Sequence, residues 1–321
     1  MFDGGFKRRN DNLGKSHGNA MACHSAVDFA RRPARPTSAM TTTASLPLRE
    51  QIALAADFIR GRAPGFAPEV GVILGTGMGA LSSQVRDAVT VEYGDIPEFP
   101  VSTVESHAGR LHLGTLGGRR VFLMQGRFHR YEGYSLQQVT FPIRVMKALG
   151  CHTLIVMNAV GSVNGLIPPG SLVLSHDMIN MMGDNPLIGP NDDSLGPRFP
   201  DMSEPFNRGL ISLAERVALE KRISGVKKGV MVAVTGPSLE TAAEYRMFQR
   251  MGADIVTMST VPETIVAVHA GLKVLAISTV TDACLPDNLH EAKLEDIIRV
   301  AGEAEPRLSA LVNGVLEGLD G

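Results

Sequence analysis

Short apolar runs that alternate with amphipathic segments restrict the fold of this 321-residue chain more than any other feature. These runs lie at 70–74, 121–124, 154–157, 172–174, 229–235, 255–258 and 274–279. Strands that are apolar on both faces are typical of a sheet covered by helices on each side. The sequence therefore predicts an α/β fold, a single domain with a largely parallel or mixed central sheet flanked by helices.

Segments with helical periodicity separate the apolar runs. Helices are expected at 48–59, 135–149, 207–219, 240–251 and 262–270, and a long helical region closes the chain. Three residues are expected to end or bend helices: Gly61 should stop the first, Pro142 should kink the second and Pro306 should interrupt the last.

The first 45 residues differ in character from the rest. They carry seven lysines and arginines against three acids, are rich in Gly, Ser, Thr and Asn, and show no sustained apolar period. This composition fits an arginine-rich targeting segment, or a disordered extension or early start codon that precedes a natural start at Met40. We predict that residues 1–45 are a disordered extension and that residues 46–321 form one catalytic domain.

The charge and cysteine content argues against several classes of protein. The formal net charge is −2, so no basic excess exists to attract nucleic acid or a membrane surface. No apolar run approaches the roughly 20 residues needed to span a bilayer. The three cysteines have no C-x-x-C spacing, which argues against a disulfide framework or a cysteine zinc site. We therefore expect a cytoplasmic protein without nucleic-acid or membrane partners.

Polar residues that follow apolar runs are candidates for a site, because ligands of open α/β sheets bind beyond the carboxyl ends of the strands. Five segments meet this condition: 75–79, 125–129, 158–161, 235–238 and 281–282. The first has the G-x-G-x-x-G/A spacing of a dinucleotide site, but it also suits a tight turn or backbone N–H groups that approach an anion. The glycines alone do not distinguish these alternatives.

Arg127 and His129 make the second segment more specific. They alternate at period two, so in an extended segment both project from one face, followed by Tyr131. The arginine fork suits phosphate oxygens, and histidine adds a donor whose charge can adapt. With His107 the chain supplies several donors for an oxyanion but no cluster of metal ligands, and His112 is interpreted as structural.

Seven motifs resemble, in order and spacing, those of the trimeric purine nucleoside phosphorylases, from about residue 48 to residue 320. They are GTGMG (75–79), SHAGR (106–110), QGRFHRYEG (125–133), NA (158–159), GPND (189–192), GPSLET (236–241) and MSTVPE (258–263). The resemblance implies the nucleoside phosphorylase fold and phosphorolysis of purine (deoxy)ribonucleosides to free base and (deoxy)ribose 1-phosphate. It also implies a role in purine salvage and a homotrimer.

The resemblance implies a phosphate site, made by Thr76, His107, Arg127, His129 and Ser259. Family members usually have serine where this chain has Thr76, and threonine keeps the hydroxyl. Inorganic phosphate is then a co-substrate that attacks the sugar, so no cofactor, metal or protein nucleophile is expected. Among these residues His129 is expected to be catalytic.

The implied sugar site follows the same motifs. Tyr131 would contact the ribose, and Met258 would pack under it. Asn158 and Ala159 would line the sugar and phosphate region through their backbone groups.

The implied base site contains Leu239, Glu240 and Asp282, and the last two are expected to be catalytic. Glu240 would accept a hydrogen bond from N1–H of a 6-oxopurine, and Leu239 would face the base where the family often has Phe. Members selective for 6-oxopurines usually have Asn where this chain has Asp282. A protonated Asp282 could act as a general acid at N7, and an ionised one could accept from a 6-amino group. Alternatively, Asp282 lies outside the pocket and serves the loop.

Glu240 argues against a full switch to adenosine, because the related methylthioadenosine phosphorylases have no glutamate there. We expect inosine and guanosine as the main substrates, with adenosine left open as a further one. A dinucleotide-dependent oxidoreductase would leave Arg127, His129 and Glu240 unexplained. A non-catalytic nucleoside-binding protein would not need so many phosphate donors.

Two further points depart from the family pattern. A histidine for the 5′-hydroxyl often lies in the last helical region, but that register falls near Leu294 and Glu295, which leaves His290 as the substitute to test. The segment after Met182 is shortened where some members insert a phenylalanine that reaches the neighbouring subunit. The intersubunit contact to the sugar is therefore open.

Overall fold

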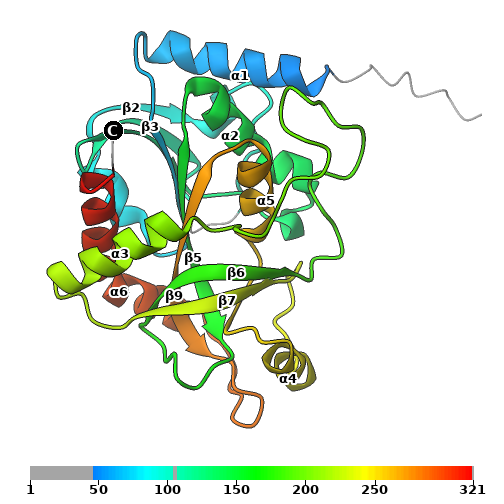
Figure 1. Ribbon diagram of the computed structural model, residues 1–321, viewed down its shortest axis with the longest axis vertical. Coiled ribbons are helices and arrows are strands. Elements are labelled where there is room, and N and C mark those ends of the chain that lie inside the picture. Colours follow the sequence, from blue (N-terminus) through cyan, green and yellow to red (C-terminus); the bar gives the residue numbers. More distant parts are fainter. Residues whose placement is uncertain (1–45, 104–106, 320–321) are drawn as a thin grey trace, which may run out of the picture. The chain divides into compact units, whose positions relative to one another are not determined.

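One mixed sheet organises the part of the chain that the computed structural model describes, residues 46–103 and 107–319 (Figure 1). Its strands are β1 (Val70–Leu74), β2 (Arg86–Glu92), β3 (Arg110–Leu116), β4 (Arg119–Gln125), β5 (Thr153–Ser162), β6 (Leu172–Asn180), β7 (Val226–Ala233), β8 (Ile255–Thr257) and β9 (Lys273–Ala283). They follow the order β2-β3-β4-β1-β5-β8-β7-β6-β9. Because β9 also pairs with β5, the strands from β5 to β9 close on themselves.

Parallel and antiparallel pairs both occur in the sheet. The pairs β1–β4, β1–β5, β5–β9, β6–β7 and β7–β8 are parallel. The pairs β2–β3, β3–β4, β5–β8 and β6–β9 are antiparallel. The predicted α/β fold with a mixed sheet flanked by helices is confirmed. Two strands, β2 and β3, were not expected from the sequence. β2 is a largely exposed edge strand, and apolar and polar residues alternate in β3, so neither contains a continuous apolar run.

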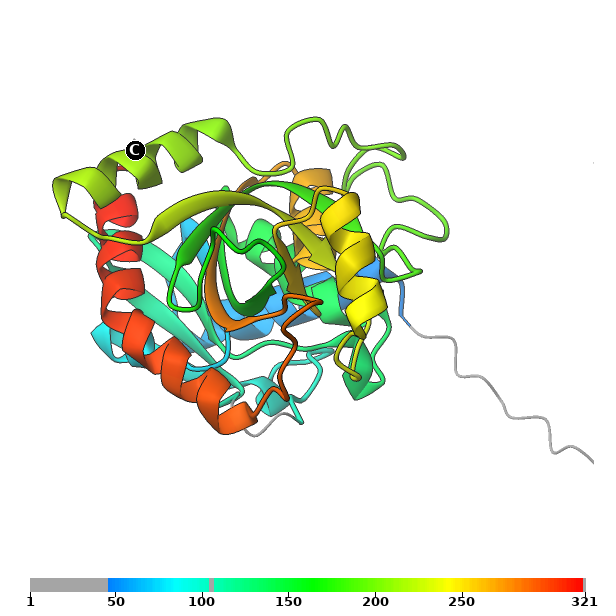
Figure 2. The same cartoon turned by 90° about the horizontal axis from the view of Figure 1, so that it is seen from below.

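Helices cover the sheet on different sides (Figure 2). They are α1 (Leu48–Arg62), α2 (Leu136–Leu149), α3 (Arg208–Glu220), α4 (Ala242–Arg250), α5 (Val261–His269) and α6 (Leu294–Glu317), with short 3₁₀ segments η1 (Gly79–Gln84), η2 (Tyr93–Asp95) and η3 (Arg130–Glu132). Helix α2 packs against α1 and α5, whereas α3 packs against α6. No helix in the described ranges has both the length and the apolar character to cross a membrane.

Capping residues set two helix starts that matter for the site. Ser135 caps α2 in a capping box with Gln138, at the start of the helix expected at 135–149. Thr241 caps α4 in a capping box with Glu244, so this helix begins at Ala242. The helix expected from residue 240 therefore starts later, and Glu240 lies in the loop that precedes it.

The expected helix breakers differ in their effect. Helix α1 ends at Arg62, one residue after the expected stop at Gly61. Helix α2 is continuous through Pro142, and the kink expected there stays a prediction. The prediction that Pro306 interrupts the last helix is wrong, since α6 is continuous around it. Proline removes one backbone donor, but burial of one face of α6, including Leu308 and Leu311, stabilises the unbroken helix.

Two central strands are longer than their apolar runs. β5 and β9 pair in register from Thr153 and Lys273 onward, with Asn158 opposite Ser278 and, after an irregularity, Gly161 opposite Asp282. Asn158 and Asp282 therefore lie within strands and not in the loops after them. The predictions for residues 1–45 concern a segment outside the described residues.

Candidate active site

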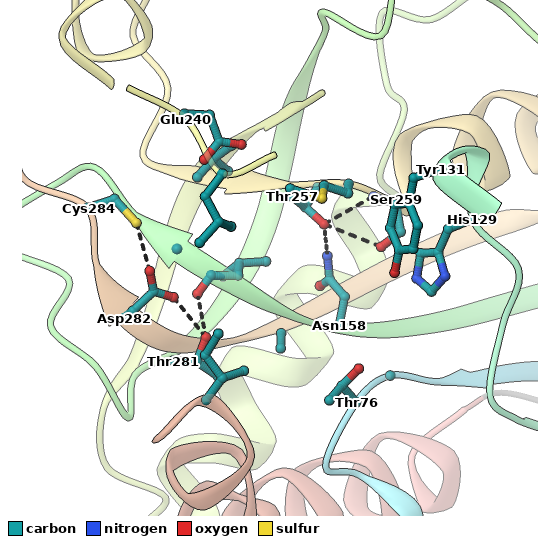
Figure 3. Close-up of a pocket in the computed structure, with 18 of the residues that line it drawn as sticks. Thr76, His129, Tyr131, Asn158, Glu240, Thr257, Ser259, Thr281, Asp282 and Cys284 are labelled. Atoms are coloured by element: carbon teal, nitrogen blue, oxygen red, sulfur yellow. Dashed lines mark hydrogen bonds between the residues drawn. The ribbon is translucent and has the colours of Figure 1, made fainter. Parts of the chain in front are cut away.

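One cavity lies at the carboxyl ends of β1, β4, β5, β8 and β9, beside the loop that follows β7 (Figure 3). The residues expected at the phosphate, sugar and base sites all line it: Thr76, His107, Arg127, His129, Tyr131, Asn158, Ala159, Leu239, Glu240, Met258, Ser259 and Asp282. The fold thus brings together segments that are far apart in the chain, at the edge where ligands of such sheets bind. In Figure 3, His129 and Ser259 lie at one end of the cavity and Glu240 and Asp282 at the other.

Arg127 is the buried cation of the cavity, with 2% of its surface exposed. Its Nη1 donates to Ser259 Oγ (2.7 Å) and Thr260 Oγ1 (3.1 Å), and its Nη2 donates to the Met157 carbonyl (2.7 Å). Burial lowers the pKa of Arg127 below its usual value, and the charge of Glu263, 3.5 Å away, offsets part of this shift. Nε has no hydrogen-bond partner among the described residues. A buried, charged donor is therefore available to an anion.

His129 is oriented by Glu132. Glu132 Oε1 accepts from the His129 backbone N–H (2.8 Å) and lies 2.9 Å from ring Nδ1, while Oε2 accepts from the backbone N–H and hydroxyl of Thr103, each at 2.8 Å. Burial raises the pKa of Glu132, but the hydrogen bonds from His129 and Thr103 outweigh it and lower the pKa to about 2. A carboxylate only accepts, so Nδ1 carries a proton and Nε2 is the ring atom left for a ligand.

Three rings stack at the same end of the cavity. The His129 ring lies between His107 (centroids 5.2 Å apart) and Tyr131 (4.6 Å), with 12° between the planes in each pair. Burial first, and the charge of Glu132 next, raise the pKa of Tyr131 to about 12. The phenol therefore keeps its proton at neutral pH and can both donate and accept a hydrogen bond.

Asn158 has both polar atoms of its side chain engaged within the protein. Its Nδ2 donates to Thr257 Oγ1 (2.9 Å), and its Oδ1 accepts from Ser278 Oγ (2.7 Å). Gly75 packs against this residue, since a Cβ at Gly75 would lie 2.8 Å from Asn158 Cα. The first glycine of the loop after β1 thus serves close packing, and Thr76 beside it lines the cavity.

The other end of the cavity holds two carboxyl groups. Burial raises the pKa of Glu240, a hydrogen bond from Tyr245 lowers it, and the charges of Glu244 and Asp282 raise it further. Leu239 lines the cavity although half of its surface is exposed. A half-buried carboxyl beside an apolar side chain suits a planar base with a polar edge.

Asp282 lines the cavity from β9 and accepts hydrogen bonds on both oxygens. Oδ1 accepts from Thr281 Oγ1 (3.0 Å), and Oδ2 accepts from the Cys284 thiol (2.9 Å) (Figure 3). This position does not fit the alternative in which Asp282 lies outside the pocket.

Sequence reasoning missed some lining residues that strand alternation could have revealed. Thr257 is two residues before Ser259, and Cys284 is two residues after Asp282, so each lies at period two from a residue that had been named. Glu132 stood inside a motif, but no role had been assigned to it.

Other lining residues have no local signal. Tyr245 on α4 and Ile297 on α6 reach the cavity only because these helices pack beside it. His290, the substitute for the 5′-hydroxyl contact, is exposed and does not line the cavity; neither does Leu294 or Glu295. His112 is structural, as interpreted, because its ring nitrogens contact side chains of the neighbouring strands β2 and β4.

No group of three or more His, Cys, Asp or Glu within residues 46–103 and 107–319 is arranged to hold a metal ion. The polar side chains that line the cavity supply one buried guanidinium, imidazoles, hydroxyls, the Asn158 amide, the Cys284 thiol and two carboxyls. Such a set can bind an anion at one end and hydrogen-bond a neutral base at the other.

Comparisons with known proteins agree with this geometry. The model of the family described as "Phosphorylase superfamily" matches residues 69–317. Purine nucleoside phosphorylase 1 of Bacillus subtilis (strain 168) is 55% identical over 269 residues, which cover 84% of this chain and 98% of the relative.

Two solved structures of the purine nucleoside phosphorylase of Schistosoma mansoni are also similar. The complex with inosine is 38% identical, with a TM-score of 0.81, and the match covers 85% of this chain and 97% of that one. The complex with adenosine is 38% identical, with a TM-score of 0.81 and coverage of 85% and 98%. The resemblance seen in the motifs is confirmed, and the chain belongs to the phosphorylase superfamily as one of its purine nucleoside phosphorylases.

Proposed function

We propose that this phosphorylase acts mainly on inosine and guanosine, releasing the base and ribose 1-phosphate or deoxyribose 1-phosphate for purine salvage. The observation that carries the proposal is that Glu240 shares one cavity with Arg127 and His129. The cavity thus offers donors to phosphate and an acceptor to N1–H of a 6-oxopurine. Because the Schistosoma mansoni protein has been solved with inosine and with adenosine, the preference rests on the residues of this chain.

The phosphate end supports direct attack by phosphate on the sugar. Arg127, His129, Ser259, Thr76 and His107 would hold the anion beside C1′. As the glycosidic bond loosens, the sugar approaches an oxocarbenium ion and the base an anion. A phosphate held against the sugar supplies proximity and a negative charge next to the developing cation. Phosphate is then a co-substrate, and this route uses no cofactor.

The sugar would lie between the two ends of the cavity. Tyr131 would contact the ribose with its protonated hydroxyl, and Met258 would pack under the ring. Since the Asn158 side chain is already bonded to Thr257 and Ser278, Asn158 would act through its backbone, as would Ala159.

The base end must stabilise the charge that grows on the leaving purine. Glu240 would accept a hydrogen bond from N1–H, and this hydrogen bond becomes stronger if the carboxylate is desolvated. Leu239 would pack against the base. At Asp282, donors on both oxygens support the acceptor role over that of a general acid at N7. An acceptor there would also admit the 6-amino group of adenosine as a secondary substrate.

We also propose a homotrimer in the cytoplasm, without nucleic-acid or membrane partners. Ile188 and Phe199, which are 65% and 87% exposed, border one apolar surface groove, and such patches often mark protein interfaces. Cys151 and Cys284 are buried free thiols, which fits a reducing compartment.

Light scattering should give the mass of three chains, and Phe199→Asp should weaken the assembly. A single-chain mass for the unaltered protein would contradict the trimer.

The first test of the mechanism is dependence on phosphate. Incubation with inosine should release hypoxanthine and ribose 1-phosphate in equal amounts when phosphate is present, because phosphate is the nucleophile. Chromatography of both products with and without phosphate makes the measurement. Release of hypoxanthine without phosphate, at the same rate, would contradict direct attack.

Glu132→Gln tests the orientation of His129. The amide keeps the shape but loses the charge that supports the Nδ1 proton, so kcat/KM for phosphate should fall about tenfold. Because the pKa of Glu132 is held at about 2, its charge persists at acidic pH, and the unaltered protein should show no loss of activity from Glu132 between about pH 5 and pH 8. Glu92→Gln, in an exposed pair with Arg110, is the matched control and should retain activity. Equal losses of kcat/KM in Glu132→Gln and Glu92→Gln would argue against a specific role of Glu132 in orienting His129.

The base preference is tested by kcat/KM for inosine, guanosine and adenosine. Inosine and guanosine should exceed adenosine, and an adenosine preference of more than about tenfold would overturn the proposal. Asp282→Asn should change guanosine phosphorolysis by less than about threefold if Asp282 is an acceptor. A much larger loss would instead identify Asp282 as a proton donor.

A further inference from the structure

Two further polar side chains, Tyr245 and Cys284, line the base end of the cavity beside its two carboxyls. Asp282 accepts from the Cys284 thiol at 2.9 Å. Burial, and next the nearby Cys284 and Glu240, raise the pKa of Tyr245, so its hydroxyl stays protonated. Among these groups, Cys284 is the one that donates directly to the carboxyl on β9.

The Cys284 thiol occupies a built position. The residue is 2% exposed, and its sulfur lies where a side chain on β5 would otherwise be, because a Cβ at Gly161 would collide with it. The same Cβ would lie 3.5 Å from Asp282 Oδ2. The absence of a side chain at Gly161 thus makes room for the contact between Cys284 and Asp282.

Two donors determine how Asp282 is presented to the cavity. Thr281 holds Oδ1 and Cys284 holds Oδ2, so the plane of the carboxyl cannot rotate freely. Each carboxylate oxygen can accept more than one hydrogen bond, and the remaining lone pairs stay available to a ligand. The direction of those lone pairs depends on the thiol.

We propose that Cys284 is a positioning residue that orients Asp282, and that it thereby sets the relative use of 6-amino and 6-oxo purines. This inference rests on the proposed placement of the base between Glu240 and Asp282. A 6-amino group donates and needs a well-directed acceptor, whereas a 6-oxo group cannot donate to a carboxylate. A 6-oxopurine relies on Glu240 through N1–H. Loss of the thiol should therefore lower kcat/KM for adenosine more than kcat/KM for inosine.

The test compares Cys284→Ala, which removes the donor, with Cys284→Ser, which keeps one. In Cys284→Ala the ratio of kcat/KM for adenosine to that for inosine should fall about tenfold, mainly through KM for adenosine. In Cys284→Ser this ratio of adenosine to inosine kcat/KM should stay close to that of the unaltered protein. Cys151→Ala removes a buried thiol outside the cavity and should leave the ratio as in the unaltered protein.

Inhibition constants for adenine and hypoxanthine provide a second readout that needs no adenosine turnover, and their ratio should shift in the same direction. An unchanged ratio in Cys284→Ala, or equal losses for both purines that serine does not restore, would overturn the inference. If the unaltered protein prefers adenosine, the proposed substrate preference fails, but the role of Cys284 is still decided by the change in ratio between variants.

Discussion

The buried guanidinium of Arg127 is the constraint on which the phosphate end of the structure depends. A charge removed from water is tolerated only when it is paired and hydrogen-bonded. Arg127 meets this condition through a carbonyl of β5, two hydroxyls that precede α5 and the carboxylate of Glu263. One side chain thus ties β4, β5 and α5 together around the place where an anion would bind.

The same contacts explain an unusual backbone conformation. Thr260, which accepts from Arg127, has a φ of 70°, a left-handed conformation that is strained for a β-branched residue. Such strain costs on the order of 1–3 kcal/mol and persists where the surroundings determine it. Here it places the Thr260 hydroxyl on the guanidinium, next to Ser259. At the opposite end of the cavity the carboxyl of Asp282 has no cationic partner of this kind in the described part of the chain and accepts instead from neutral donors, the Thr281 hydroxyl and the Cys284 thiol.

Local patterns predicted much of the fold, and their failures have physical causes. Apolar runs located the central strands, and Ser135 marked the start of α2. Strands β2 and β3 were not predicted, because neither contains a continuous apolar run. Pro306 was misinterpreted because propensity is local, whereas the packing that stabilises α6 involves residues from other elements. The ends of β5 and β9 were placed too early, since pairing between them extends both strands beyond their apolar segments.

By itself, the sequence determined which chemical groups are available and, through seven ordered motifs, that they belong to one phosphorylase site. The type of each side chain sets whether it can donate or accept a hydrogen bond, as for Arg127, His129 and Glu240, whatever its position in the fold. Only the tertiary structure decided that Glu132 orients His129 with help from Thr103, and that the Cys284 thiol donates to Asp282. The reason is that periodicity specifies the face on which a side chain lies, whereas strand register and helix packing specify what it meets.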